Sequence, residues 1–379
     1  MTPGPDLADG GIRRLALWAV FAAFVLAQAV LAARLIAIQP LGFDFAPLWT
    51  ALRLVGEGRL DALYDFQAVT AAQQWLTGET SKTRPFVNPP TYLLFAPLGQ
   101  LPFPAAYGLW AAASLAAFLA ATARAFGWRA ALLALATPAV GLVMLIGQSS
   151  LVVGALVLVG LKLRQRPLLA GLALAFAAAI KPQLLVLAPF ALAAERRWGA
   201  LLICGAAGLA LCLISAAVFG AGPWIAWFDA LQRFHRLIAA DPSLLAEAVT
   251  PASLLVAWHA PQAALLACQI LSLAGGAAAV WAVFRRSEDL AVRSIAVIGM
   301  GLLASPYAMA YELAMLAPAL ACLALRVDRR LWLAAFGSYL LLVMVVPGPL
   351  ALALILALSL GPLAASDSRA SKRALAAAE

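Results

Sequence analysis

Long apolar runs separated by short polar breaks make up most of the chain. A helix needs about 20 apolar residues to cross the hydrocarbon of a bilayer, and the longest runs reach that length: 14–38, 103–124, 198–219 and 263–284. Shorter apolar runs fill the remainder: 130–146, 149–162, 167–180, 183–194, 290–304, 308–325, 331–346 and 350–365. Such short runs need shielding by neighbouring helices or a place beside a cavity. We therefore predict an all-α polytopic membrane protein with about 12 (roughly 10–13) transmembrane helices.

The distribution of Lys and Arg predicts how these runs are threaded. Counting every run as one crossing puts both termini on the same side, together with 18 of the 26 Lys and Arg residues. Basic residues accumulate on the cytoplasmic side. We therefore expect one integral membrane domain over 1–379, with cytoplasmic termini, a cytoplasmic tail at 366–379 and extracytoplasmic loops at 39–102 and 220–262. Long loops usually carry function, so the outer face is where we expect the chemistry.

Composition supports the membrane assignment and removes several classes of function. Hydrophobic residues make up 65% of the chain and charged residues 11%, with a mean hydropathy of +0.95. Soluble proteins carry about 25% charged residues, so a soluble enzyme is excluded. The net charge of +9 lies in short clusters between apolar runs, which is typical of topology signals, and nucleic acid is not an expected partner. Alanine-rich composition and short cytoplasmic connections favour a bacterial plasma (inner) membrane.

Asp44 is the leading candidate for acid–base chemistry. It follows the first apolar run directly and is flanked by Phe43 and Phe45. Aromatic neighbours at a membrane surface partly desolvate a carboxylate, and desolvation raises a carboxyl pKa toward the range useful for proton abstraction. An ordinary solvated loop acid is the alternative. We expect 46–56 to form a short helix along the interface, anchored by Trp49, and about 91–100 to form a half-inserted helix.

Lys181 is the leading candidate for binding a phosphate. It lies between two short apolar runs, where a charged residue is expensive and usually functional, although a lysine that reaches to the interface is the alternative. Gln148, in the polar break at 147–150, is placed to donate a hydrogen bond to a sugar or phosphate. A simple helix-capping turn explains that break equally well.

Glu312 lies inside an apolar run and must therefore face the bundle interior or a cavity. A sugar hydroxyl or Lys181 is a natural partner for its carboxylate. Tyr307 and Tyr311 are spaced to share one helical face and suit stacking against a sugar ring, with core packing as the alternative.

Arg233 and His235 form a basic, aromatic segment in the second outer loop. Such a segment suits a lipid phosphate, although a surface amphipathic helix without a ligand is an open alternative. Asp44 has no second acid close by in sequence that would help hold a divalent ion. We therefore expect no metal and no cofactor. The four cysteines lie in apolar runs without metal-ligand spacing and are expected to be inert thiols.

Taken together, the motifs resemble glycosyltransferase family 87, a group of polyprenol-phosphate-sugar-dependent transferases with the GT-C membrane fold. The motifs that carry the resemblance span about 40–320: Asp44-Phe45, Trp49, Gly56, Tyr64-Asp65, Asn88-Pro89-Pro90, Pro97-Leu98, Trp110, Gly147-Gln148-Ser149, Lys181-Pro182, Ser305-Pro306-Tyr307 and Tyr311-Glu312. Many relatives carry a histidine near Ser305-Pro306, where this chain has a tyrosine.

The resemblance implies a GT-C-like bundle and an inverting sugar transfer at the extracytoplasmic face. The donor would be a polyprenyl-phosphate sugar, with mannose or arabinose the leading candidates, and the acceptor a glycolipid or glycan. Asp44 matches the general base of the first outer loop. The resemblance also implies that further aromatic and polar side chains bind sugar or acceptor: Trp49, Tyr64, Asp65, Asn88, Tyr307, Tyr311 and Glu312.

Two other classes of function remain open from the sequence. A transporter or a lipid or glycolipid flippase would have polar residues on both sides of the membrane midplane, and transporters commonly contain internal repeats. Here the candidate polar residues gather on the outer side, and no repeat is evident. A non-catalytic partner in a cell-envelope complex is the third possibility.

Overall fold

The computed structural model describes residues 40–77, 87–240 and 248–326, together with isolated positions between 19 and 37 and between 353 and 357. These residues form helices and a single isolated β-bridge, with no strand among them. The all-α prediction is therefore confirmed for this part of the chain. The runs predicted at 14–38, 331–346 and 350–365 fall almost wholly, and the tail at 366–379 wholly, outside the described residues.

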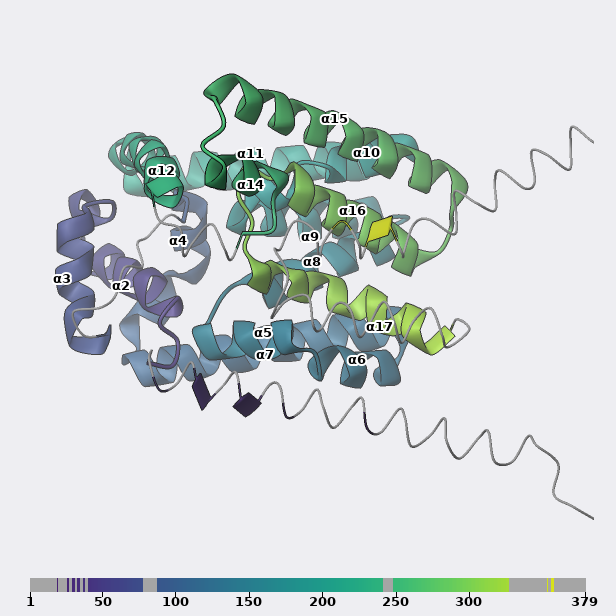
Figure 1. Ribbon diagram of the computed structural model, residues 1–379. Coiled ribbons are helices and arrows are strands. Elements are labelled where there is room, and N and C mark those ends of the chain that lie inside the picture. The colour runs from purple at the N-terminus through teal and green to yellow at the C-terminus, as the bar shows by residue number, and fades with distance from the viewer. Residues whose placement is uncertain are drawn as a thin grey trace, which may run out of the picture.

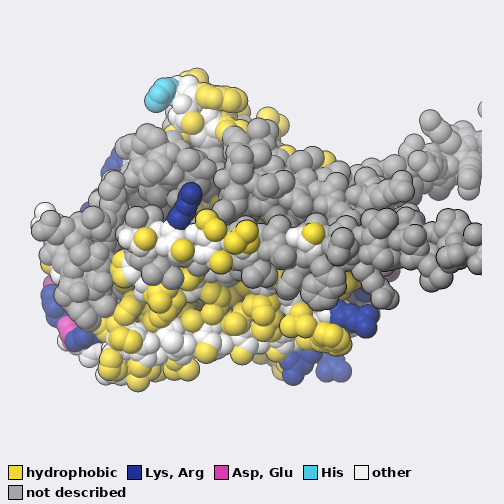
Figure 2. All heavy atoms as spheres, turned by 60° about the horizontal axis from the view of Figure 1, so that its bottom comes forward, with side chains coloured by type: hydrophobic (Ala, Val, Ile, Leu, Met, Phe, Trp, Pro, Cys, Tyr) yellow, Lys and Arg dark blue, Asp and Glu magenta, His cyan; other side chains and the backbone are white. Residues whose placement is uncertain are grey.

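Three helices in the described part of the chain are long and apolar enough to cross a membrane: α5 (Phe103–Phe126), α11 (Trp198–Phe219) and α15 (Gln262–Arg286). Each begins and ends within about two residues of a predicted run. Their outward faces are apolar. Leu202 of α11 is 72% exposed, for example, and Leu271 of α15 is 71% exposed. Apolar side chains also dominate the described surface in Figure 2, with charged side chains mainly at its ends. Lipid is the environment that such a surface fits.

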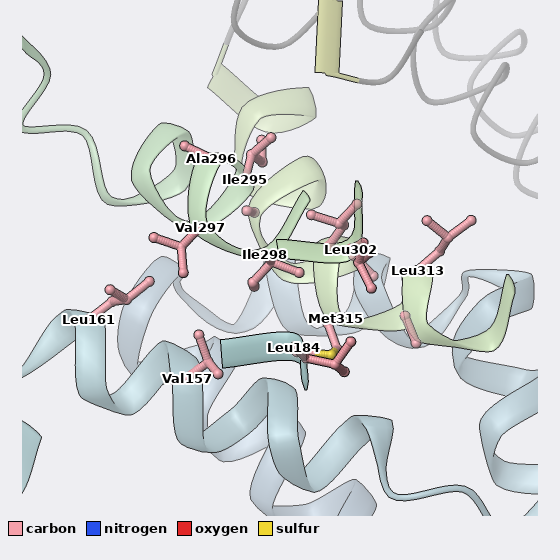
Figure 3. Packing of buried hydrophobic residues seen from close by; sticks show 14 of the residues in the cluster. Val157, Leu161, Leu184, Ile295, Ala296, Val297, Ile298, Leu302, Leu313 and Met315 are labelled. Atoms are coloured by element: carbon pink, nitrogen blue, oxygen red, sulfur yellow. The ribbon is translucent and has the colours of Figure 1, made fainter. Parts of the chain in front are cut away.

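Shorter helices lie between the long ones: α8 (Ser150–Lys162), α9 (Pro167–Ile180), η3 (Pro182–Leu185), α10 (Ala188–Ala194) and α16 (Leu290–Ala304). Figure 3 shows Val157 of α8, Leu184 of η3 and Ile298 of α16 converging in one buried cluster. Gly301 permits the close approach, because a Cβ there would lie 2.7 Å from the carbonyl oxygen of Leu184. The predicted shielding of short apolar runs by their neighbours is thus what the structure shows.

Two predicted runs are broken, and each break has a proline beside it. Run 130–146 is a pair of helices, α6 (Trp128–Leu135) and α7 (Pro138–Ile146), bent by 66°. Run 308–325 is η4 (Ala310–Leu316) followed by α17 (Ala317–Arg326), with Pro318 in the first turn of α17. Proline lacks an N–H and collides with the preceding turn of a helix. A crossing over 130–146 therefore stays a prediction, and the structure shows that this run is bent.

Most of the remaining elements gather at one end of the bundle, on the left of Figure 1. The remaining elements are α2 (Phe45–Gly56), η1 (Leu60–Ala62), α3 (Phe66–Thr77), α4 (Pro89–Phe95), η2 (Ala96–Gln100), α12 (Gly222–Ala240) and α14 (Pro251–Ala257). Helix α2 matches the predicted helix, but Trp49 is only 2% exposed and its Nε1 donates to the Leu101 carbonyl at 2.9 Å. Trp49 therefore anchors α2 to η2 and is not an interfacial anchor.

Ion pairs tie the loops together at the opposite end. Glu195 forms ion pairs with Arg164, at 3.0 Å between the charged atoms, and with the buried Arg293, at 2.8 Å, and Arg293 also pairs with Glu288 at 3.0 Å. These basic residues are among those that the charge count places on one side. Residue 195 lies beside the end of α8, whereas Lys181 contacts its start. Segment 182–194 therefore runs back along α8, as predicted from treating 167–180 and 183–194 as two separate runs.

We expect single cysteines at residues 165 and 221 to react from opposite sides of the membrane. Gln165 lies in the exposed turn between α8 and α9, and Ala221 in the exposed turn after α11, at the other end of the bundle. A membrane-impermeant maleimide applied to intact cells should label residue 221, and residue 165 only after permeabilisation. The background should lack the four native cysteines, which are all free thiols. Labelling of both positions from one side would contradict the threading.

Candidate functional site

Four polar side chains from distant parts of the sequence form a continuous hydrogen-bonded chain near α2 and α4. The Gln148 Nε2 donates to Asp44 Oδ2 at 3.0 Å, and the Lys181 Nζ donates to Gln148 Oε1 at 3.2 Å. Lys181 also donates to Glu312 Oε1 at 2.8 Å. A carboxylate, an amide, an ammonium and a second carboxylate thus follow one another. All four were predicted site residues, and the structure brings them together.

Asp44 is held by the backbone at the end of α7. Its N–H donates to the Ile146 carbonyl at 2.9 Å, and the N–H of Gly42 donates to the Leu145 carbonyl at 2.8 Å. These carbonyls are at the C-terminus of a helix, where acceptors lack an intrahelical donor. Asp44 precedes α2 but makes no capping bond with its side chain. Its half-buried carboxylate is directed toward Gln148 instead.

Gly147 sets the turn that presents Gln148. It adopts φ +82°, in the left-handed region that favours glycine, and a Cβ there would lie 2.6 Å from the Cβ of Phe45. The Trp110 Nε1 donates to the Gly147 carbonyl at 2.9 Å, and the rings of Phe45 and Trp110 stack with centroids 5.7 Å apart. The turn and the start of α2 therefore pack as one unit.

Lys181 lies where α9 ends and Pro182 starts η3. Besides Gln148 and Glu312, its ammonium contacts Ser150 Oγ at 3.4 Å and lies 5.1 Å from the centre of the Tyr311 ring. The C-terminus of a helix carries a partial negative charge, which favours a cation at this point. Ser150 was not among the predicted site residues, although the polar run at 147–150 was.

Glu312 is the most deeply buried member of the site. Its side chain is 1% exposed, against 11% for Lys181. A buried carboxylate needs a charged partner, which Lys181 supplies at Oε1. Within the described residues, the Glu312 Oε2 atom has no hydrogen-bond partner. A buried acceptor in this state is a natural place for a substrate hydroxyl to bind.

The break between α16 and η4 carries Tyr307 to the same site. The Gln269 Nε2 from α15 donates to the Ala304 carbonyl at 3.0 Å, and the Val249 N–H donates to the Ala308 carbonyl at 2.8 Å. Burial first, and then the nearby carboxylates of Glu312 and Asp44, raise the pKa of Tyr307, so its hydroxyl stays protonated.

Tyr307 and Tyr311 do not share a helical face, because η4 begins only at Ala310. That prediction was wrong. It assumed a helix that starts near 306, whereas the chain is extended or bent over 305–309 and bridges to Ala248 through Met309. Both tyrosines nevertheless reach the site, Tyr311 through its ring beside Lys181.

Three residues implied by the family resemblance hold the outer elements together. The Tyr64 hydroxyl donates to the Val87 carbonyl at 2.8 Å, and burial raises its pKa, so that it remains a donor. Asn88 caps α4 by accepting from the Thr91 N–H at 3.0 Å, and Asp65 accepts from the Gln67 N–H at 2.9 Å. Sugar or acceptor binding by these residues, or by Trp49, stays a prediction.

Thr91 is a supporting residue that sequence analysis missed. Its hydroxyl donates to the Ala179 carbonyl at 3.0 Å, which ties α4 to the last turn of α9, two residues before Lys181. The only signal was its place three residues after Asn88, which is typical of a capped helix start. Asn88 and Thr91 therefore position the loop that carries the ammonium.

Arg233 of α12 lies in the wall of a separate hollow of about 580 Å³. Its guanidinium lies 5.1 Å from the centre of the Phe66 ring. The hollow is lined by acidic, polar and aromatic residues, with one alanine: Asp61, Tyr64, Asp65, Phe66, Gln67, Ala226, Asp229 and Arg233. The structure therefore places Arg233 beside Asp65 and not beside Lys181. The side chain of His235 lies outside the described residues.

A model of glycosyltransferase family 87 matches residues 86–306, more than half of the chain. The chain belongs to glycosyltransferase family 87. This family 87 protein matches no curated protein and no solved structure, so its likeness to the GT-C fold stays a prediction. The matched segment contains Gln148 and Lys181 but neither Asp44 nor Glu312. The hydrogen bonds described above connect those two carboxylates to the segment that defines the family.

Replacing Gly147 with alanine should destabilise this glycosyltransferase more than the same change at Gly58. Both glycines have positive φ, +82° and +72°, but a Cβ at Gly58 would meet nothing within 4 Å. The backbone cost, about 1–2 kcal/mol, is therefore shared, and the collision with Phe45 adds ~1–3 kcal/mol for Gly147→Ala alone. Unfolding in detergent would measure the difference. Equal stability of the two variants would contradict the packing at the turn.

Proposed function

We propose that this glycosyltransferase moves a sugar from a polyprenyl-phosphate donor to an acceptor hydroxyl at the extracytoplasmic face, with inversion at the anomeric carbon. The observation that carries the proposal is the chain Asp44–Gln148–Lys181–Glu312. It joins a carboxylate suited to accept a proton to an ammonium suited to accept a phosphate, in a single site. A transporter or flippase has no need of that pairing.

In the proposed reaction, Asp44 removes the proton from the acceptor hydroxyl as its oxygen attacks the anomeric carbon. The bond between that carbon and the phosphate oxygen breaks, and its electron pair remains on the phosphate. Polyprenyl phosphate is a good leaving group and needs charge stabilisation more than a proton. Attack from the side opposite the phosphate inverts the configuration. Protonated Asp44 and the lipid phosphate are the other products.

Lys181 is suited to receive the phosphate. Its three N–H groups contact Glu312 at 2.8 Å, Gln148 at 3.2 Å and Ser150 at 3.4 Å. The Ser150 contact is near the limit of a hydrogen bond, so exchanging it for a phosphate oxygen costs least. Glu312 then keeps the ammonium in place, and its second oxygen is suited to bind a sugar hydroxyl. Tyr307 and Tyr311 border the same space.

The substrates follow from this chemistry and from the family. We propose a mannose or arabinose donor and a glycolipid or glycan acceptor in a bacterial inner membrane, with no metal or cofactor. The hollow beside Arg233, Asp65 and Tyr64 suits the polar sugars of such an acceptor, since carboxylates and amides accept and donate hydrogen bonds to hydroxyl groups.

Asp44→Asn should lower sugar transfer by about 10²–10⁴-fold, the usual contribution of a general base, and leave donor binding intact. Membranes that contain the full chain would be incubated with labelled decaprenyl-phosphate mannose, arabinose or glucose and bacterial envelope glycolipids. Glu57→Gln is the matched control, because Glu57 is an exposed acid at the end of α2. Full transfer by the Asp44 variant would remove this residue from the mechanism.

Lys181→Met combined with Glu312→Gln should raise the donor KM about tenfold or more, as one lost charge-assisted hydrogen bond of ~1.5–3 kcal/mol implies. The double substitution avoids leaving a buried carboxylate without its ion-pair partner. Ser150→Ala should change the donor KM less than about threefold, given its long contact. A donor KM that stays constant in the double variant would rule out phosphate binding by Lys181.

A further inference from the structure

Gln148 lies between the two charged groups on which the proposed reaction depends. Its Nε2 is 3.0 Å from Asp44 Oδ2, and its Oε1 is 3.2 Å from Lys181 Nζ. From this geometry we propose that Gln148 is a positioning residue, whose amide fixes the proton-accepting carboxylate and couples it to the phosphate-binding ammonium. This inference rests on the proposed function and replaces a role for Gln148 as a phosphate ligand.

The orientation of the amide is dictated by its two partners. An ammonium can only donate hydrogen bonds, and an ionised carboxylate can only accept them. The amide oxygen must therefore face Lys181 and the NH₂ group must face Asp44. The reverse orientation would oppose two donors at one end and two acceptors at the other. Both ends of the side chain are then engaged by protein groups.

The backbone around Gln148 restricts its side chain further. Gly147 and the Trp110 bond to its carbonyl fix the turn, and the Gln148 N–H donates to the Val143 carbonyl at 3.3 Å. Held in this way, the amide directs one carboxylate oxygen of Asp44. Positioning is a large part of the catalytic value of a base, since a misplacement of about 1 Å can cost about 100-fold in rate.

The link also affects the ionisation of Asp44. A hydrogen bond donated to a carboxylate favours its charged form, and a second carboxylate in the same place would disfavour it. Within the described part of the chain, titratable or charged groups face this part of the site from α5, the end of α9, the α16–η4 break and η4, and they include Tyr107, Lys181, Tyr307, Tyr311 and Glu312. Gln148 adds a neutral amide that contacts both Asp44 and Lys181 directly.

The first experiment measures the protonation of Asp44 without any substrate. A water-soluble carbodiimide modifies protonated carboxyl groups, and peptide mass spectrometry would locate the modification at Asp44 as a function of pH. Gln148→Glu places two carboxylates about one hydrogen bond apart, so modification of Asp44 near neutral pH should rise about tenfold or more, the change that one pKa unit produces. Gln100→Glu, at an exposed glutamine at the same end of the bundle, should leave it unchanged.

The second experiment separates positioning from phosphate binding. Gln148→Met removes both hydrogen bonds without adding charge. Positioning predicts a kcat about 10–100-fold lower, with the KM for the labelled decaprenyl-phosphate donor changed less than about threefold. If Gln148 were instead a phosphate ligand, the donor KM would rise and kcat would change little. In Gln148→Glu, the acidic limb of the pH–rate profile should also move about one unit to higher pH.

The outcomes distinguish this inference from the proposed function. If Asp44 modification in Gln148→Glu equals that in the Gln100→Glu control, the coupling is overturned, even where sugar transfer occurs. If modification rises but the wild-type chain transfers no sugar from any of the three donors, the coupling holds and the proposed donor class fails. A raised donor KM with unchanged kcat in Gln148→Met assigns Gln148 to the phosphate.

Discussion

The ion pair between Lys181 and Glu312 is the constraint on which the rest of the site depends. Their charged atoms lie 2.8 Å apart, with the side chains 11% and 1% exposed. Neither charge is tolerable alone at such burial, because removing one partner of a buried pair costs about 3–5 kcal/mol. The end of α9 and the start of η4 must therefore lie side by side. The Lys181 ammonium held there donates to Gln148, and Gln148 in turn donates to Asp44.

Breaks in the helices follow from the same constraint. Lys181 is at the end of α9, and Tyr307 and Glu312 lie at and just after the break between α16 and η4. Backbone groups freed by such breaks are tolerated at membrane depth only inside the protein or beside a polar cavity. The bonds from Thr91 to Ala179 and from Gln269 to Ala304 satisfy carbonyls next to these two breaks. Helices α4 and α15 thus supply donors to carbonyls in the last turns of α9 and α16.

Sequence patterns predicted the helices better than their bends, and the polar chain better than the aromatic residues around it. Runs 167–180, 198–219 and 290–304 match α9, α11 and α16 because a continuous apolar segment has few alternatives in a membrane. Lys181 and Glu312 were identifiable because a charge inside an apolar run, or between two short ones, demands a partner. Trp49 and Asn88 bond to backbone atoms of Leu101 and of α4, which the sequence did not predict, and substrate binding by these two residues stays a prediction. No local pattern shows which distant carbonyl an indole will reach, or that Arg233 will pack on Phe66.

The order of groups along the polar chain has a consequence for catalysis. If Lys181 paired directly with Asp44, the adjacent positive charge would lower the affinity of that carboxylate for a proton and weaken it as a base. It would also occupy the ammonium that we propose binds the donor phosphate. Glu312 takes the direct pairing instead, and the neutral amide of Gln148 separates base from cation while holding both. In the proposed mechanism, a second acid therefore has a function even though it transfers no proton: Glu312 balances the buried charge of Lys181, whose ammonium can then exchange its long contact with Ser150 for the donor phosphate.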